Sequence, residues 1–169
     1  MSLVQVATNT VTSAVASVEF VSKITTDDVY LLTMNNVRSS SDAQYFARAM
    51  SSSSVDSSSN YDYAHKYLKS DTSFANVSNT NNDVGFLLTT TQESNLGNAN
   101  VLAYFYNLQN ASEYNFCSSE EAHLQHTPNN VRGIQGGSVL TVASAYDGLH
   151  IYGSAGNITQ GTFTLFKVI

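Results

Sequence analysis

Hydrophobic and polar residues alternate with a period of two along much of this chain, whereas helical periodicity is scarce. Residues 29–34, for example, place Tyr30, Leu32 and Met34 on one side. A period of two points successive side chains to opposite faces of a β-strand. By this criterion, strands are also expected at residues 18–20, 45–50, 61–67, 85–91, 101–108, 114–116, 121–126, 139–143, 149–152 and 162–169.

Roughly nine to eleven short strands separated by polar loops are typical of an all-β protein. We therefore predict an antiparallel β-sandwich that is jelly-roll-like. Residues 101–108 are apolar on both sides, so this strand is expected at the centre of the sandwich. Residues 41–50 also fit a helix, because Ala43, Ala47 and Met50 would share one face, but the overall pattern favours a strand.

With 169 residues, the chain is long enough to build one domain with its own core. Residues 17–169 are expected to form this single β-sandwich domain. Residues 1–16 have a β-rich composition without clean alternation, which fits an N-terminal arm that reaches a neighbouring subunit or a plain first strand. Near the other end, a Gly-Asn turn at residues 156–157 precedes an apolar-rich run to Ile169, which predicts a last strand within the core fold.

Three polar or glycine-rich stretches interrupt the strand pattern. Residues 51–60 are serine-rich and residues 78–83 are asparagine-rich, so both are expected to be exposed loops. Residues 133–138 superficially resemble a phosphate-binding loop, but they lack its lysine and its following helix. We expect a β-turn or a bulge there.

The charge of the chain argues against two classes of partner. Its formal net charge is −6, and its 7 Lys and Arg residues are scattered along the sequence. Nucleic acids and anionic membranes select basic surfaces, so neither is an expected partner. The first basic residue is Lys23 and no apolar run has the length of a membrane-spanning helix, so we expect neither a signal peptide nor a span.

The share of charged residues is also low, at 12%. The polar surface must therefore come from Ser, Thr and Asn. Such a surface suits close packing against neighbouring proteins, because little charge has to be desolvated, and it equally suits a surface with no partner.

No arrangement of residues predicts catalysis, so a non-enzymatic protein is expected, with no catalytic residue, no cofactor and no metal. The chain has no Gly-x-Ser-x-Gly motif. His123 and His126, with Glu120 and Glu121, resemble a metal site, yet positions i and i+3 of a strand point to opposite faces. The single cysteine, Cys117, allows no intrachain disulfide and is expected to be a small buried hydrophobe.

Tyr61, Tyr63 and Tyr67 form the candidate binding face. Together with His65 they are spaced by two, which places four rings on one side of a strand. Such a row suits stacking on a glycan or packing at an interface, and it is also common in sheet cores. The chain has 10 Tyr and no Trp, and the absence of Trp weakens the glycan interpretation.

Several stretches resemble a family of small virion-associated proteins of tailed phages, especially marine and cyanobacterial ones. Ser17–Phe20 resembles the opening strand of this family, and Thr25–Tyr30 resembles its turn into an aromatic second strand. Leu108–Ser112 is similar to a polar turn that follows a central strand. Gly153–Ile158 and Gly161–Phe166 resemble the end of the family, a Ser-Gly-Asn-Ile-type turn before a Gly-Thr-Phe-x-Leu-Tyr strand.

This resemblance implies an all-β virion component and carries over no catalytic residue. Phe166 stands where the family usually has Tyr, and the chain ends in Lys-Val-Ile where others end near Gly-Ile or Gly-Leu. The first expectation is a head decoration or cement protein that binds the capsid exterior. The alternative is a tail-fibre or receptor-binding module that recognises host surface glycans, and a stand-alone lectin or hydrolase is a third interpretation.

The expected location is the virion, after synthesis in the host cytoplasm. The expected partners are other virion proteins, namely the major capsid protein or tail proteins. A homo-oligomer is also expected, and a trimer is preferred by analogy with other β-rich virion modules.

The two interpretations of residues 1–16 differ in a measurable way. If these residues are an arm, a chain that lacks residues 2–16 should bind particles more weakly while the sandwich stays folded, because only a contact to the neighbour is lost. Co-sedimentation with particles measures the binding, and thermal unfolding measures the fold. Equal binding by the truncated chain would rule out the arm.

Overall fold

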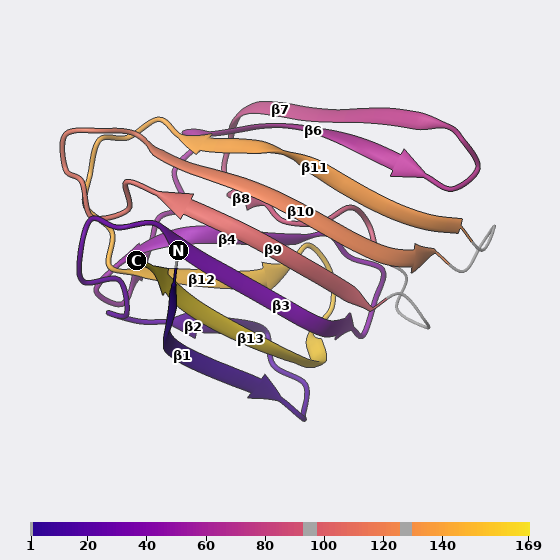
Figure 1. Ribbon diagram of the computed structural model, residues 1–169, viewed down its shortest axis with the longest axis horizontal. Helices are drawn as coiled ribbons and strands as arrows, with labels where there is room; N and C mark the ends of the chain where they lie inside the picture. The colour runs from indigo at the N-terminus through magenta and orange to yellow at the C-terminus, as the bar shows by residue number, and fades with distance from the viewer. Residues whose placement is uncertain (1, 93–97, 126–129) are drawn as a thin grey trace.

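The computed structural model describes residues 2–92, 98–125 and 130–169, and within these ranges it contains strands and loops but no helix. The 13 strands of the described residues form two antiparallel sheets. In Figure 1 the larger sheet lies in front of the smaller one. The predicted all-β antiparallel sandwich is confirmed.

The larger sheet has eight strands in the order β1 (Leu3–Val11), β13 (Ile158–Val168), β3 (Tyr30–Ser39), β9 (Ala99–Tyr106), β10 (Asn115–Gln125), β11 (Asn130–Leu140), β6 (Tyr61–Lys69) and β7 (Phe74–Asn82). The smaller sheet contains β2 (Ser17–Phe20), β12 (Gly148–Gly153), β4 (Tyr45–Ser51), β5 (Ser54–Val55) and β8 (Phe86–Leu87). The chain alternates between the sheets from β1 to β4 and again from β11 to β13, which makes the sandwich jelly-roll-like.

Several predictions of loops, turns and strand number were wrong. In most of these places, pairing with long neighbouring strands decides the structure, and the local sequence does not. The described residues form 13 strands where nine to eleven were expected, because β5 has only 2 residues, too few to leave an alternating pattern, and β7 was not predicted. Residues 78–82 are part of β7 and not a loop, because they pair with β6. Residues 133–138 continue β11 without a turn, since β10 and β6 pair with them on both sides. Residues 45–51 form a strand, which excludes the helical alternative.

The hydrophobic core lies between the inner faces of the two sheets. Its largest fully buried side chains include Tyr30, Tyr45, Phe105 and Phe163. In β9, every second residue from Val101 to Phe105 is buried, as expected for a strand in the middle of the sheet. The other side of β9 faces solvent and remains apolar, with Leu102 46% exposed. The strand was expected at the centre of the sandwich, and β9 does lie inside the larger sheet, between β3 and β10, although only one of its two apolar sides faces the core.

Both ends of the chain belong to the larger sheet. β1 pairs with β13 from Leu3 to Val11, so the N-terminal segment is a first strand of the sandwich. The backbone N–H groups of Ser2 and Ile169 each donate to the carbonyl of the other residue, at 2.8 and 2.9 Å. The predicted C-terminal core strand is confirmed by β13, which lies between β1 and β3. Removing residues 2–16 would take away a paired strand, so the truncated chain is no longer expected to fold unchanged.

Two neighbouring glycines of β11 provide a test of the packing. A Cβ on Gly136 would lie 2.3 Å from the Ala64 carbonyl oxygen and 2.5 Å from His65 Cγ, whereas a Cβ on Gly137 would meet only the Cys117 carbonyl oxygen, at 3.7 Å. We expect Gly136→Ala to lower the free energy of unfolding by about 1–3 kcal/mol, because the strand must shift. Gly137→Ala is the matched control and should change it by less than about 0.5 kcal/mol. Urea unfolding measures both, and equal effects would contradict this account.

Candidate functional site

The face of the larger sheet that points away from the smaller sheet, here called the outer face, is unusually apolar. Its side chains alternate with the core residues along β6, β7, β9, β10 and β11. The exposed large apolar side chains of this face are Leu68, Phe74, Leu102, Phe116, Leu124 and Val131. An exposed apolar patch on a folded domain marks a surface that contacts something else.

A row of small side chains crosses the outer face. The strand register aligns Ser78 with Ala64, Ala64 with Gly137, and Gly137 with Ser118. These residues lie on β7, β6, β11 and β10, so the row spans three strand spacings, or roughly 15 Å. Because these side chains are short, the row forms the floor of a groove, here called the outer groove.

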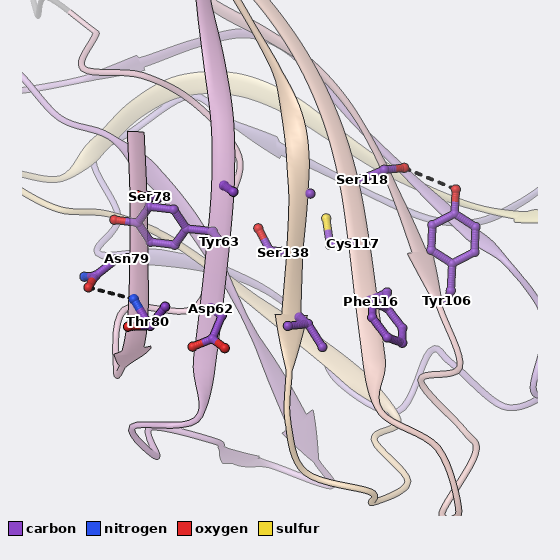
Figure 2. A pocket seen from close by; sticks show the side chains of 13 residues that line it. Asp62, Tyr63, Ser78, Asn79, Thr80, Tyr106, Phe116, Cys117, Ser118 and Ser138 are labelled. Carbon is purple, nitrogen blue, oxygen red and sulfur yellow. Dashed lines mark hydrogen bonds between the residues drawn. The ribbon is translucent and has the colours of Figure 1, made fainter. Parts of the chain in front are cut away.

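Larger side chains stand along one side of this floor. Val139, Phe116 and Tyr106 are register partners in the next row, with Asp62 at its β6 end. Together with the floor, these residues line a hollow of about 510 Å³. Asp62, Phe116 and Tyr106 can be followed in Figure 2. The Tyr106 hydroxyl is 3.1 Å from Ser118 Oγ, which fixes the tyrosine against the floor. This side of the groove is therefore an apolar and aromatic wall.

The opposite side of the floor is polar. Glu120 and Gln135 are register partners there, and Gln135 Nε2 donates to Glu120 Oε1 at 2.8 Å. A second hollow, of about 470 Å³, is lined by these two residues and by Leu102, Tyr104 and Tyr106, and it continues the groove onto β9. The outer groove thus has one apolar wall and one wall of hydrogen-bonding groups.

Two carboxylates, those of Asp62 and Glu120, line the groove, and each of them already accepts a hydrogen bond. The Asp62 carboxylate already accepts the backbone N–H of Asn81 at 2.7 Å, and Glu120 accepts the Gln135 amide. The aromatic residues of the apolar wall, Phe116 and Tyr106, are of the kind that is enriched at the centre of protein–protein interfaces.

The tyrosine row predicted as a binding face lies mainly on the inner face. Tyr61 has no exposed surface, and its hydroxyl accepts the Ala49 N–H at 3.1 Å and donates to the Asp56 carbonyl at 3.2 Å. Burial raises the pKa of Tyr61. Stacking of a ligand on this ring is therefore excluded, and Tyr61 is a core residue.

The other two tyrosines of that row are only partly buried. Tyr63 and Tyr67 pack against a second apolar cluster formed by Phe46, Leu87 and Ile134. Tyr63 also lines one end of the outer groove, close to β7 (Figure 2). Burial and the nearby Glu121 carboxylate raise the pKa of Tyr67. A binding role for these two residues remains a prediction.

The remaining sequence candidates are distributed over both faces. Cys117 is buried and unpaired, as predicted, and burial raises the pKa of its thiol. Glu120 lies on the outer face, whereas Glu121 and His123 lie on the inner face of the same strand. His126 lies outside the described residues. Sequence analysis missed the outer groove, because its floor residues belong to four different strands and only the register brings them together.

Comparisons with protein-family models, with curated proteins and with solved structures found no significant match to this chain. Among the residues that the structure describes, no helix is long and apolar enough to cross a membrane. The outer groove is therefore interpreted from its own geometry.

The buried His65 beneath the groove floor makes the stability of the fold depend on pH. Its Nε2 lies 3.3 Å from Ser138 Oγ, and burial lowers the pKa of His65 to about 4. In the unfolded chain the pKa is about 6.5, so between these values the unfolded state binds more protons. The stabilisation from neutral His65 is complete above pH 6.5 and is lost as the pH falls from about 6.5 to 4.

We expect His65→Gln to remove about 1–3 kcal/mol of this pH-dependent change in the free energy of unfolding. Urea unfolding at several pH values between about 4 and 7 measures the change for both proteins. The difference between the two slopes is assigned to His65, because this substitution removes only that titratable group. A wild-type slope in His65→Gln would show that His65 does not titrate in this way.

Proposed function

We propose that this protein is a non-enzymatic structural component of a phage particle, a head decoration or cement protein that docks on the capsid exterior through its outer face. The observation that carries the proposal is the outer groove, whose apolar wall of Val139, Phe116 and Tyr106 is left open to solvent. The resemblance of its strand and turn segments to virion-associated proteins supports the choice of partner.

Docking on a capsid would need only a small part of the surface of this protein. A standard protein interface buries about 800 Å² on each partner, roughly a tenth of the 7536 Å² surface of this chain. On a capsid, a protein that spans the joint between two subunits adds buried area where internal pressure would open the shell. Repetition of the same modest contact over a symmetric particle strengthens the attachment through avidity, especially if the protein is a trimer.

A tail-fibre or receptor-binding role is the second candidate, and the polar wall favours it. Glu120 and Gln135 present hydrogen-bonding groups opposite the aromatic rings of Tyr106 and Phe116. Glycan sites combine these two kinds of contact, with rings that stack on the sugar and polar groups that bind its hydroxyls. In this case the ligand would be a host surface glycan that lies along the groove.

The number of copies in purified particles distinguishes the two roles. Quantitative mass spectrometry against the major capsid protein should give a ratio near one to one, or a simple symmetric fraction of it, for a decoration protein. A few copies to a few dozen would place the protein on the tail and favour the glycan role. Complete absence from particles would contradict both.

The two walls can also be tested separately. If the protein docks on a capsid, Phe116→Ser should weaken its binding to particles from which this protein has been removed by about tenfold or more. The reason is that the change removes a central aromatic contact. Leu124→Ser is the matched control, since Leu124 is 40% exposed on the same strand and face, against 44% for Phe116, but does not line the groove. It should bind within about twofold of the wild type.

Gln135→Ala distinguishes a capsid protein from a glycan as the ligand of the groove. A capsid contact that relies on the apolar wall should lose less than about threefold from this change, whereas a glycan site should lose about tenfold. Binding to an array of surface polysaccharides provides the second measurement. Unchanged particle binding by Phe116→Ser would overturn docking through the outer groove.

A further inference from the structure

The larger sheet ends at β1, and one edge of this strand has no neighbour. Among the described residues β1 pairs in the sheet with β13 alone, and it lies at one margin of the sheet in Figure 1. An edge strand presents a row of unpaired backbone N–H and C=O groups, which can pair with another strand. Charged residues and prolines usually protect such an edge, but residues 1–18 contain no charged residue, no histidine and no proline.

The hydrogen bonds of β13 show which backbone groups of β1 point outward. Ile169 exchanges backbone hydrogen bonds with Ser2, whereas the Val168 N–H donates to Val29, which precedes β3. Residues of β13 therefore bond alternately to β1 and to β3, and the odd-numbered ones bond to β1. Their partners on β1 include Val4, Ala7 and Asn9. The residues of β1 that point their N–H and C=O groups away from β13 are therefore Leu3, Gln5, Thr8 and Thr10.

These four residues, here called the β1 edge residues, also belong to the outer face. All four are exposed. Gln5 begins a row of register partners that leads to Ser118 on the groove floor, and Thr8 begins the next row, which leads to Glu120. Leu3 and Thr10 alternate with them along the strand, so they face the same way. The outer face and the open edge therefore meet along β1.

We propose that two copies of this protein pair through β1, antiparallel and about a two-fold axis, so that their larger sheets form one continuous sheet. The β1 edge residues of the two copies then meet one another, because their positions are symmetric about the middle of the strand. Leu3 lies opposite Thr10, and Gln5 lies opposite Thr8. Val6, the extra residue that interrupts the register with β13, occurs at the same place in both copies, so the two strands stay in step.

The absence of charge along β1 favours a second copy as the partner. Each copy has a net charge of −6, so two copies repel each other wherever their acidic residues come close. Pairing through β1 brings only neutral side chains face to face. It also covers part of Leu3, which is 48% exposed in the single chain. Cross-strand pairs of neutral polar and apolar side chains add to the backbone hydrogen bonds.

A pairing of this kind has a defined size and shape. A contact along one strand is smaller than a standard interface, so we expect a dissociation constant of about 10–100 µM. Both copies use the same edge, so the assembly stops at a dimer, in contrast to the trimer expected by analogy. The outer grooves of the dimer face the same side, so a particle with repeated subunits can bind both grooves at once. The pairing itself does not depend on the proposed function.

The test is sedimentation velocity of the untagged chain from about 5 to 500 µM, which should show a monomer that becomes a dimer. Gln5→Lys with Thr8→Lys places like charges opposite each other in the central pairs, and Gln5→Glu with Thr8→Glu does the same with the opposite sign. Each double variant should associate with itself at least about tenfold more weakly than the wild type. An equimolar mixture of the two should dimerise again, because lysine then lies opposite glutamate.

The mixture also controls for changes within one copy. Both variants lose the 3.1 Å hydrogen bond between Thr8 and Thr164, so recovery in the mixture can come only from the contact between copies. A mixture that stays monomeric, or charged variants that dimerise like the wild type, would overturn the proposal. Hydrogen exchange of residues 3–10 provides a second measurement, and it should slow as the dimer forms.

Asn76→Lys is the matched control at the other edge of the sheet. Asn76 is exposed on β7 and ends the row of register partners that Thr8 begins. This variant should dimerise within about twofold of the wild type. Loss of the dimer in Asn76→Lys would place the contact at β7 and contradict the proposal. A wild-type chain that stays monomeric at every concentration would exclude a second copy and leave the edge to a strand of another protein.

Discussion

Backbone pairing among β10, β11 and β6 is the interaction on which the rest of the structure depends. It decides which residues of three long strands stand side by side on each face of the larger sheet. A slip of one residue would turn Phe116 into the core and expose Cys117 and Glu121. The observed register instead gives each face its own character, with an apolar core and buried polar residues inside and a groove with two different walls outside.

The alternating pattern was enough to predict the fold class, because burial of every second residue leaves a direct trace in the sequence. It could not predict which strands are neighbours. Ala64, Gly137 and Ser118 are unremarkable along the chain and become a groove floor only through the register. The apolar residues on both sides of β9 correctly predicted a strand inside the sheet, but they could not show that one side, with Leu102, remains exposed on the outer face.

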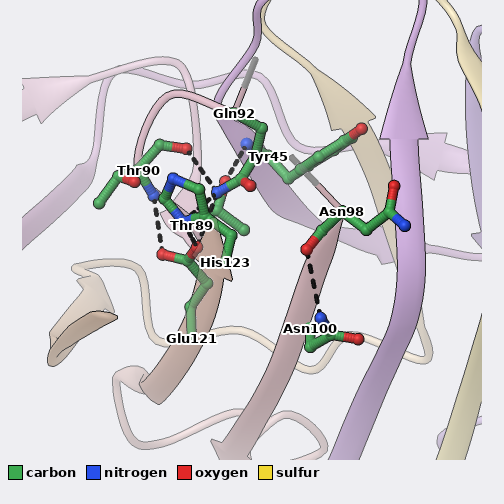
Figure 3. Close-up of polar contacts among 8 residues, drawn as sticks. All are labelled: Tyr45, Thr89, Thr90, Gln92, Asn98, Asn100, Glu121 and His123. Atoms are coloured by element: carbon green, nitrogen blue, oxygen red, sulfur yellow. Dashed lines mark hydrogen bonds and ion pairs between the residues drawn. The ribbon is translucent and has the colours of Figure 1, made fainter. Parts of the chain in front are cut away.

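The tyrosine row and the buried polar residues of β10 also show what residue spacing alone cannot predict. Spacing by two correctly placed Tyr61, Tyr63 and Tyr67 on one face, but it could not tell the inner face from the outer one. Glu121 and His123 are two positions apart, so their spacing also places them on one face. The sequence analysis compared His123 with His126, three positions further on, and not with Glu121. Gln92 comes from a distant segment, so its contact with Glu121 and His123, drawn in Figure 3, required the three-dimensional structure.

The larger sheet ends in two unpaired edges, β1 and β7, and such edges recruit strands from other molecules unless something prevents it. In β7 the residues after Val77 are all Ser, Thr or Asn. Asn81 adopts a left-handed backbone conformation, with φ of 52°, and the pairing of β7 with β6 is irregular between Tyr61 and Tyr63. A twisted, polar edge of this kind is a poor template for a further strand, which protects the protein against uncontrolled polymerisation.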